Sequence, residues 1–221
     1  MRAVYVHGFL GDPTVWNQED AIALPGHGGG PVWPTWRDNL SAIAAAIGEC
    51  DVVVGYSLGA RVALGLVAER YVPRAVLISV NPGIDDHERA ARRASDAAWA
   101  TRARADFPAF LDAWEAQPLF ATARARAPEE RARRRARRLR HDPDQIARSL
   151  EVMGLAEMPD YRTAITPART ALIVGAEDAK YVAIARSCAA PREEIAACGH
   201  DPTLEQPAAL EVALARLLQG T

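Results

Sequence analysis

Continuous apolar runs alternate along the chain with segments whose apolar residues recur at helical spacing. The runs lie at residues 3–6, 21–24, 51–55, 75–80 and 170–175, with a weaker one that ends at Ala197. Continuous rather than alternating hydrophobicity is typical of strands buried on both faces. Helical periodicity is clearest at residues 40–48, 58–70 and 207–219. The pattern predicts an α/β fold: a mostly parallel sheet of about six strands, flanked by helices.

The alternation breaks between Pro82 and Pro167, where no segment has a convincing strand pattern. This stretch is rich in alanine and arginine and is interrupted by prolines, which favours several short helices. A structureless loop of that length is uncommon in a compact domain. We therefore expect an α/β core made of residues 1–82 and 167–221, with residues 83–166 inserted as a helical lid, or cap.

Composition excludes several classes of protein. A chain of 221 residues with 49% hydrophobic residues and a net charge of −2 is an ordinary globular protein, so we expect no nucleic-acid partner. The arginine-rich run at 130–141 is interpreted as a solvated helical face. No apolar stretch is long enough for a membrane span or a signal peptide, which predicts a cytoplasmic protein without membrane contact. Three cysteines at no metal spacing predict reduced thiols and no metal site.

The first candidate for chemistry is Ser57, in the sequence Gly55-Tyr56-Ser57-Leu58-Gly59. This G-x-S-x-G pattern lies between an apolar run and a helical segment, where small glycines permit the sharp turn that lifts a serine hydroxyl clear of the sheet. A serine that only caps the helix is the simpler alternative. The strand-turn-helix context favours a catalytic serine.

A catalytic serine needs a histidine within reach and an acid that orients the histidine. On such a sheet the expected chain order is serine, acid, histidine. His200 follows the last predicted strand and precedes the C-terminal helix, so it is the preferred histidine of the five. Asp178 follows the strand at 170–175 and is the preferred acid, although Glu177 stays open.

Negative charge that develops during the reaction needs donors that are already in place, and backbone amides serve well. Leu58 offers one amide at the start of the helix that follows the serine. Phe9 offers a second in the loop after the first strand.

Seven segments, taken together, resemble the α/β-hydrolase superfamily. They are HGFLGDPTVW, ALPGHGG, GYSLGARVAL, NPGIDDHERAARRASDAAW, AWEAQPLFAT, VGAEDAKY and CGHDPTLEQP. Within the superfamily the chain resembles MenH, the 2-succinyl-6-hydroxy-2,4-cyclohexadiene-1-carboxylate synthases of menaquinone biosynthesis. The resemblance implies a lyase without metal or organic cofactor, which removes a proton from a small polycarboxylate and eliminates pyruvate. Ser57 would then act as a base, activated by His200 and Asp178.

The resemblance also implies a substrate site. It assigns carboxylate binding to Arg61, Arg92 and Arg140, and a lining role to Tyr56 and Trp114. Arginine suits carboxylates because its planar fork stays charged and binds two oxygens at once. A slip of register in the arginine-rich lid would select Arg89, Arg93 or Arg138 instead.

The chain departs from the family between Gly11 and Leu24, where too few residues remain for the helix usual there. The sheet is therefore expected to be trimmed, with part of one face covered by segment 31–36 or by a second subunit of a homo-oligomer. A small esterase or thioesterase with an acyl-enzyme on Ser57 is the main alternative, and a non-catalytic scaffold is a third. Arg61 favours the lyase, because an esterase for neutral chains has no use for a buried unpaired cation.

Overall fold

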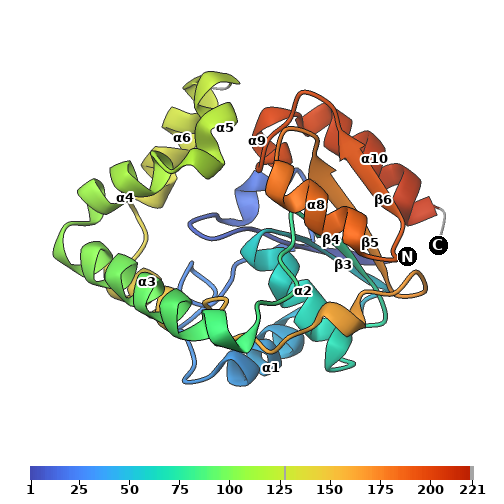
Figure 1. The fold of residues 1–221 in the computed structure, drawn as a ribbon, viewed down its shortest axis with the longest axis horizontal. Helices are drawn as coiled ribbons and strands as arrows, with labels where there is room; N and C mark the ends of the chain where they lie inside the picture. Colours follow the sequence, from blue (N-terminus) through green and yellow to red (C-terminus); the bar gives the residue numbers. More distant parts are fainter. Residues whose placement is uncertain (127, 220–221) are drawn as a thin grey trace.

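One parallel sheet forms the centre of the molecule in the computed structural model, which describes residues 1–126 and 128–219. Within these residues the strand order is β2-β1-β3-β4-β5-β6, and every neighbouring pair runs parallel (Figure 1). The strands are β1 Ala3–Val6, β2 Ala21–Ile22, β3 Val52–Tyr56, β4 Ala75–Ile78, β5 Thr170–Gly175 and β6 Arg192–Ile195. The predicted α/β fold with a six-stranded sheet is confirmed.

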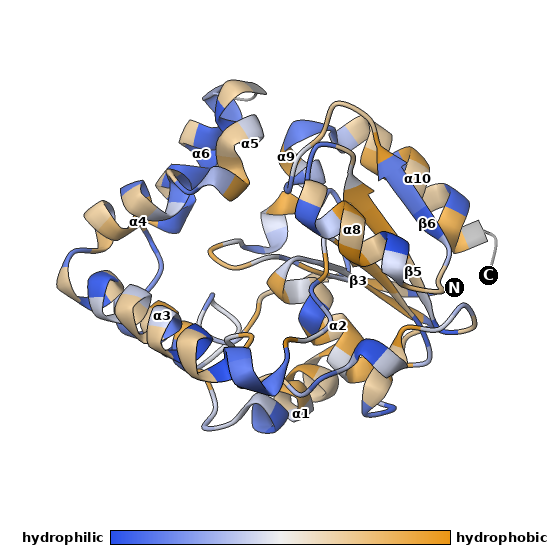
Figure 2. Ribbon diagram, viewed as in Figure 1, coloured by the Kyte–Doolittle hydropathy of each residue, from blue (hydrophilic) through white to orange (hydrophobic). Residues whose placement is uncertain are grey.

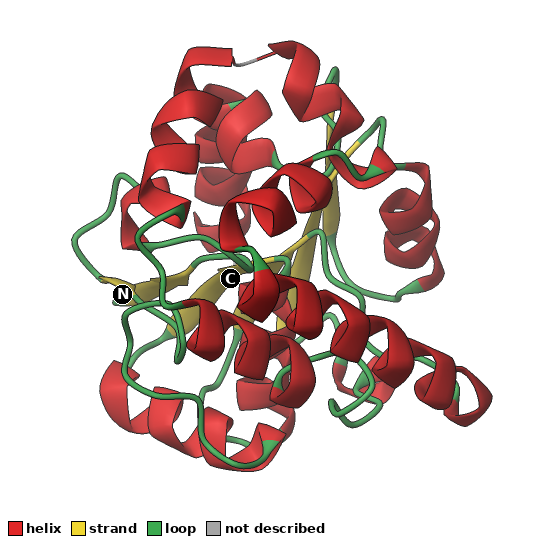
Figure 3. Ribbon diagram, turned by 90° about the vertical axis from the view of Figure 1, so that its left-hand side faces the viewer, coloured by secondary structure: helices red, strands yellow, loops and turns green. Residues whose placement is uncertain are grey.

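Burial on both faces explains the continuous apolar runs. Every residue of β3 and β5 is buried, and both strands are strongly hydrophobic in Figure 2. The edge strand β6 is polar by contrast, which accounts for its weak pattern in the sequence. Helices cover both sides of the sheet, as Figure 3 shows. These covering helices are α1 Trp36–Ile47, α2 Leu58–Ala68 and α8 Ala179–Ser187 on one face, and α10 Pro207–Gln219 on the other.

The short segment between Gly11 and Leu24 forms only a 3₁₀ turn, η1 Pro13–Val15. Directly after the turn, Trp16 packs its ring 5.4 Å from that of Tyr5 and joins the core cluster under α10. Segment 31–36 buries Val32 and Trp36, the first residue of α1, in the opposite cluster with residues of α1 and α2. Trp16 therefore covers the sheet where the longer helix is missing. The expectation that segment 31–36 covers this face is wrong, because its buried side chains pack on the opposite face.

Residues 83–166, which we call the cap, lie between β4 and β5, and the elements that they form within the described residues are helices. Their helices are α3 Asp86–Ala105, α4 Phe107–Glu115, η2 Pro118–Phe120, α5 Ala121–Arg126, α6 Pro128–Arg138, α7 Pro143–Val152 and η3 Arg162–Ala164. The cap has its own apolar cluster, which includes Phe110 and Ile146 and into which Leu10 inserts from the loop after β1. The cap is thus packed against the carboxyl ends of the strands.

Arginines of the run on α6 form ion pairs inside the protein. Arg134, Arg137 and Arg138 form ion pairs with Asp201, Asp12 and Glu115 respectively. The interpretation of this run as a solvated face was therefore wrong for these three side chains, because acids on other elements neutralise them.

Candidate active site

Ser57 lies at the sharp turn between β3 and α2, with a φ of 53°. Glycines permit this turn. A Cβ on Gly59 would lie 2.3 Å from the carbonyl oxygen of Val6, and one on Gly55 would lie 2.2 Å from the carbonyl oxygen of Gly59. Because these close atoms belong to the backbone and cannot move aside, only glycine fits at positions 55 and 59. The turn leaves Ser57 partly exposed, at the positive end of α2.

Ser57, His200 and Asp178 form a hydrogen-bonded chain. The Oγ of Ser57 lies 3.2 Å from Nε2 of His200, and Nδ1 of His200 lies 2.7 Å from Oδ2 of Asp178. The carboxylate accepts from Nδ1, which leaves Nε2 free to accept the serine proton. Asp178 is buried, whereas Glu177 is exposed. The structure thus brings together the three preferred residues and gives the histidine contact to Asp178.

The loop that carries His200 is held by residues that the sequence analysis missed. The carboxylate of Glu205 accepts the backbone N–H of Gly199 at 2.9 Å and that of Asp201 at 3.2 Å, so it clamps both neighbours of the histidine. Ser79 donates its hydroxyl to the carbonyl oxygen of His200 at 3.0 Å. Ser79 lies outside the seven family segments, and Glu205 lies within CGHDPTLEQP, where the sequence alone gave it no role beside the histidine.

The amides of Phe9 and Leu58 lie in the loop after β1 and at the start of α2, and both residues line the cavity above Ser57. Within the described residues, neither backbone N–H donates a hydrogen bond to another group of the protein. Both amides are therefore available to an oxygen that carries negative charge.

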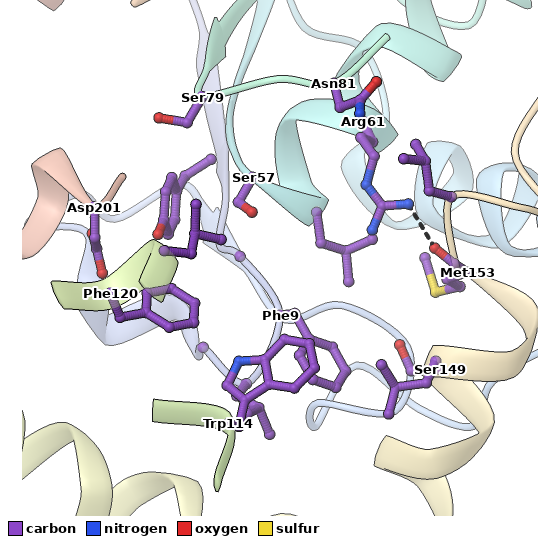
Figure 4. A pocket seen from close by; sticks show the side chains of 18 of the residues that line it. Phe9, Ser57, Arg61, Ser79, Asn81, Trp114, Phe120, Ser149, Met153 and Asp201 are labelled. Carbon is purple, nitrogen blue, oxygen red and sulfur yellow. Dashed lines mark hydrogen bonds between the residues drawn. The ribbon is translucent and has the colours of Figure 1, made fainter. Parts of the chain in front are cut away.

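A cavity of about 410 Å³ opens between the core and the cap, beside Ser57 (Figure 4). Trp114 and Phe9 form part of its apolar wall, with ring centroids 4.8 Å apart. Tyr56 also lines it, 5.8 Å from the ring of His200, and burial raises the pKa of Tyr56 well above its usual value. Tyr181, missed in the sequence, lies closer to His200, at 4.5 Å. The structure therefore places both Tyr56 and Trp114 at the wall of the cavity.

In the part of the chain that the structure describes, five basic side chains line the cavity: Arg61, Arg92, Arg134, Arg138 and Lys180. Three of the arginines have carboxylate partners: Arg92 pairs with Asp96 at 2.9 Å, Arg134 with Asp201 at 3.1 Å, and Arg138 with Glu115 at 2.7 Å.

Arg61 differs from these three arginines. It donates to the carbonyl oxygen of Met153 at 2.9 Å, a contact drawn in Figure 4, and within the described residues no carboxylate lies at ion-pair distance. Burial, with the nearby charge of Arg92, lowers the pKa of Arg61 to about 10. An anion in the cavity would compensate this charge.

Arg140 is exposed and does not line the cavity. It lies two residues beyond the end of α6, and Arg138 takes the place facing the cavity instead. This is the slip of register that the repeated arginines made possible. Arg92 does line the cavity, although Asp96 already pairs with it.

No membrane-crossing helix and no metal cluster is found among the described residues. None of the described helices combines the length and the apolar content that a span needs. Across the same residues, no three His, Cys, Asp or Glu side chains converge as metal ligands.

Comparison with known proteins places the chain in a class. The model of the alpha/beta hydrolase family matches residues 3–213, and the chain belongs to this family of enzymes. The chain is 33% identical to the 2-succinyl-6-hydroxy-2,4-cyclohexadiene-1-carboxylate synthase of Salmonella paratyphi C (strain RKS4594), over 98% of the chain and 93% of that protein. The synthase of Salmonella agona (strain SL483) is 32% identical over the same shares. The resemblance seen in the sequence is confirmed.

Solved structures share the fold. MenH from S. aureus superimposes with a TM-score of 0.90 at 24% identity, covering 99% of this chain and 93% of that one. A thermophilic esterase from Thermogutta terrifontis, solved with malate bound, gives a TM-score of 0.77 at 24% identity, over 99% and 89% of the two chains.

Proposed function

We propose that the protein is a lyase of menaquinone biosynthesis that eliminates pyruvate to form 2-succinyl-6-hydroxy-2,4-cyclohexadiene-1-carboxylate. The names of its relatives support this reaction. The observation that carries the proposal is Arg61, a partly buried guanidinium in the same cavity as Ser57, without a carboxylate partner among the described residues. A substrate carboxylate supplies the missing anion. A cytoplasmic location is part of this proposal.

The serine acts as a base in this proposal. His200 accepts the hydroxyl proton of Ser57 at Nε2 while Asp178 stabilises the charged imidazole. The oxygen of Ser57 removes a proton from a ring carbon of the substrate. The electron pair forms a new double bond as the carbon–oxygen bond to the pyruvyl group breaks, and the released enolate takes up a proton to become pyruvate.

Negative charge is stabilised along this path by groups already in place. The amides of Phe9 and Leu58 face an oxygen of the substrate, and Arg61 binds a carboxylate at the other side of Ser57. Trp114 and Phe9 contact the apolar face of the ring. Arg138 adds positive charge from the cap, because its partner Glu115 is shared with Arg131 and Arg135. No resident cofactor takes part in these steps.

The same triad and amides also serve an esterase, so the test compares the two reactions directly. The purified protein is given the pyruvate-bearing cyclohexene precursor, and pyruvate release is followed beside hydrolysis of a short-chain p-nitrophenyl ester. Fast release that Ser57→Ala abolishes, with slow ester hydrolysis, supports the lyase. Ester hydrolysis without pyruvate release overturns the proposal and makes Ser57 a nucleophile.

A further inference from the structure

A buried ion pair joins the cap to the loop that carries His200. Nη1 of Arg134, on α6, lies 3.1 Å from Oδ2 of Asp201, the residue after the histidine. The two side chains are only 7% and 6% exposed. Arg134 also donates to the hydroxyl of Thr203 at 3.1 Å and to its carbonyl oxygen at 2.9 Å. One cap side chain thus donates hydrogen bonds to three acceptors in this loop.

Stability alone does not explain such a pair. Burying two charges costs about as much as their attraction returns, so apolar residues of similar size would serve folding equally well. The contact nevertheless lies directly beside His200, whose position relative to Ser57 matters for proton transfer. Glu205 already holds the two amides beside His200, and Ser79 holds its carbonyl oxygen. Arg134 is the one member of this set that comes from the cap.

The helix that carries Arg134 also faces the cavity. Arg138 lies one helical turn further along α6, lines the cavity and pairs with Glu115. Figure 4 shows Asp201 beside Phe120 on one side of Ser57, with Arg61 on the other side. A single rigid helix therefore contacts both the substrate cavity and the histidine loop.

We propose that Arg134 and Asp201 are positioning residues, which align His200 with Ser57 through the contact between cap and loop. They touch neither reacting atom. The proposal rests on the catalytic role given to His200 in the proposed function. If the pair aligns His200 with Ser57, loss of the pair lowers turnover while substrate binding stays nearly unchanged.

The test uses the full chain with four variants: Arg134→Met, Asp201→Asn, the double variant and Arg134→Lys. Arg133→Met is the matched control, because Arg133 lies on the same helix, is 63% exposed and pairs only with Glu130 among the described residues. Steady-state kinetics give kcat and KM separately, and thermal unfolding reports the folded fraction. Imidazole nitrogen NMR signals of His200, assigned with His200→Gln, report its ring environment without any substrate.

Arg134→Met and Asp201→Asn should each lower kcat about 10-fold to 100-fold, the range that a small misplacement of a catalytic group produces, with KM within about twofold. The double variant should be no worse than either single variant, because the two side chains act as one unit. Arg134→Lys should recover part of the loss. The His200 ring signals should shift in the Arg134→Met variant and stay in place in the control.

Two results would overturn the proposal. A raised KM with unchanged kcat would make Arg134 a substrate ligand instead. Unchanged His200 signals, with activity lost only in step with the folded fraction, would make the pair purely structural. If wild-type protein releases no pyruvate, the proposed function fails; the kinetics then use p-nitrophenyl ester hydrolysis, and the NMR comparison still decides the positioning role.

Discussion

Arg61 donates a hydrogen bond to the carbonyl oxygen of Met153 at 2.9 Å, and its acceptor is thus a neutral group at the end of α7. A carbonyl oxygen compensates a guanidinium charge less well than a carboxylate does. The Arg61→Met variant should therefore lose binding to an anionic substrate, with KM raised about 10-fold to 100-fold. Pyruvate release at varied substrate concentration measures this effect.

The free energy of unfolding serves as the control for the Arg61→Met variant. Replacing an uncompensated charge by an apolar side chain should leave the free energy of unfolding unchanged or higher. The comparison variant is Arg37→Met. The Arg37 side chain is 75% exposed, and its replacement should change neither KM nor the free energy of unfolding. If Arg61→Met unfolded more easily and bound substrate normally, the arginine would be a structural residue.

Asp178 and Glu177 are adjacent acids, but only Asp178 contacts His200, at 2.7 Å. The Asp178→Asn variant keeps the shape of the side chain and removes the charge that orients the imidazole. We expect kcat to fall by about 10⁴-fold, as in other serine–histidine–aspartate sites. Glu177→Gln, with its exposed side chain, should keep nearly full activity. Equal losses in the two variants would contradict the assignment.

The fold was predictable because its signals are local and periodic. Strands buried on both faces must be continuously apolar, and the chain shows five such runs where β1 to β5 lie. The neighbourhood of Ser57 was predictable for a similar reason: its glycines cannot carry a Cβ, so spacing alone marks the turn. Asp178 and His200 follow strands directly, where parallel strands deliver their loops to one edge.

The cap side of the site was not predictable to the same degree. Helical arginines repeat so closely from 131 to 140 that a change of one or two residues moves the side chain from cavity to solvent. Which of them faces inward depends on where α6 ends and on acids far away in sequence, such as Asp201 and Glu115. Glu205 lies close in sequence to the two amides that it accepts, but only the folded turn at 199–205 brings its carboxylate to them.

Gly59 should tolerate no side chain. Its added Cβ would lie 2.3 Å from the carbonyl oxygen of Val6 and 2.5 Å from that of His7, and both are backbone atoms. Gly59→Ala should therefore lower the free energy of unfolding by more than about 2 kcal/mol, measured by urea unfolding. Gly65→Ala on the same helix is the control, because its Cβ would meet only side-chain atoms of Leu40 and Tyr161. Equal stability of the two variants would exclude a backbone constraint at Gly59.

Three histidines meet where the loop after β1 contacts the cap. The ring of His27 lies 5.4 Å from those of His7 and His141. Burial lowers the pKa of all three, to about 4 for His7. The unfolded chain binds protons below about pH 6.5, whereas native His7 stays neutral down to about pH 4. The contribution of His7 to the free energy of unfolding should thus be fully present above pH 6.5. It should be lost on acidification towards pH 4, which lowers the free energy of unfolding by on the order of 3 kcal/mol.

Urea unfolding between pH 7 and pH 4.5 measures this dependence on pH. His141→Asn removes one titrating ring from the cap side and should flatten the slope. The exposed His87 offers the comparison, since His87→Asn should leave the slope unchanged. Identical slopes for wild type and both variants would show that the cluster does not control acid stability.

Arg138 and Arg140 test which cap arginine serves the substrate. Arg138 lines the cavity, while Arg140 is exposed two residues beyond the end of α6. Arg138→Met should raise KM for the anionic substrate about 10-fold, and Arg140→Met should leave it unchanged. Glu115 keeps two other arginines in reach, with Arg131 at 3.8 Å and Arg135 at 3.9 Å, so the loss of Arg138 does not leave it uncompensated. An increase of KM in Arg140→Met alone would mean that the end of α6 turns inward when substrate binds.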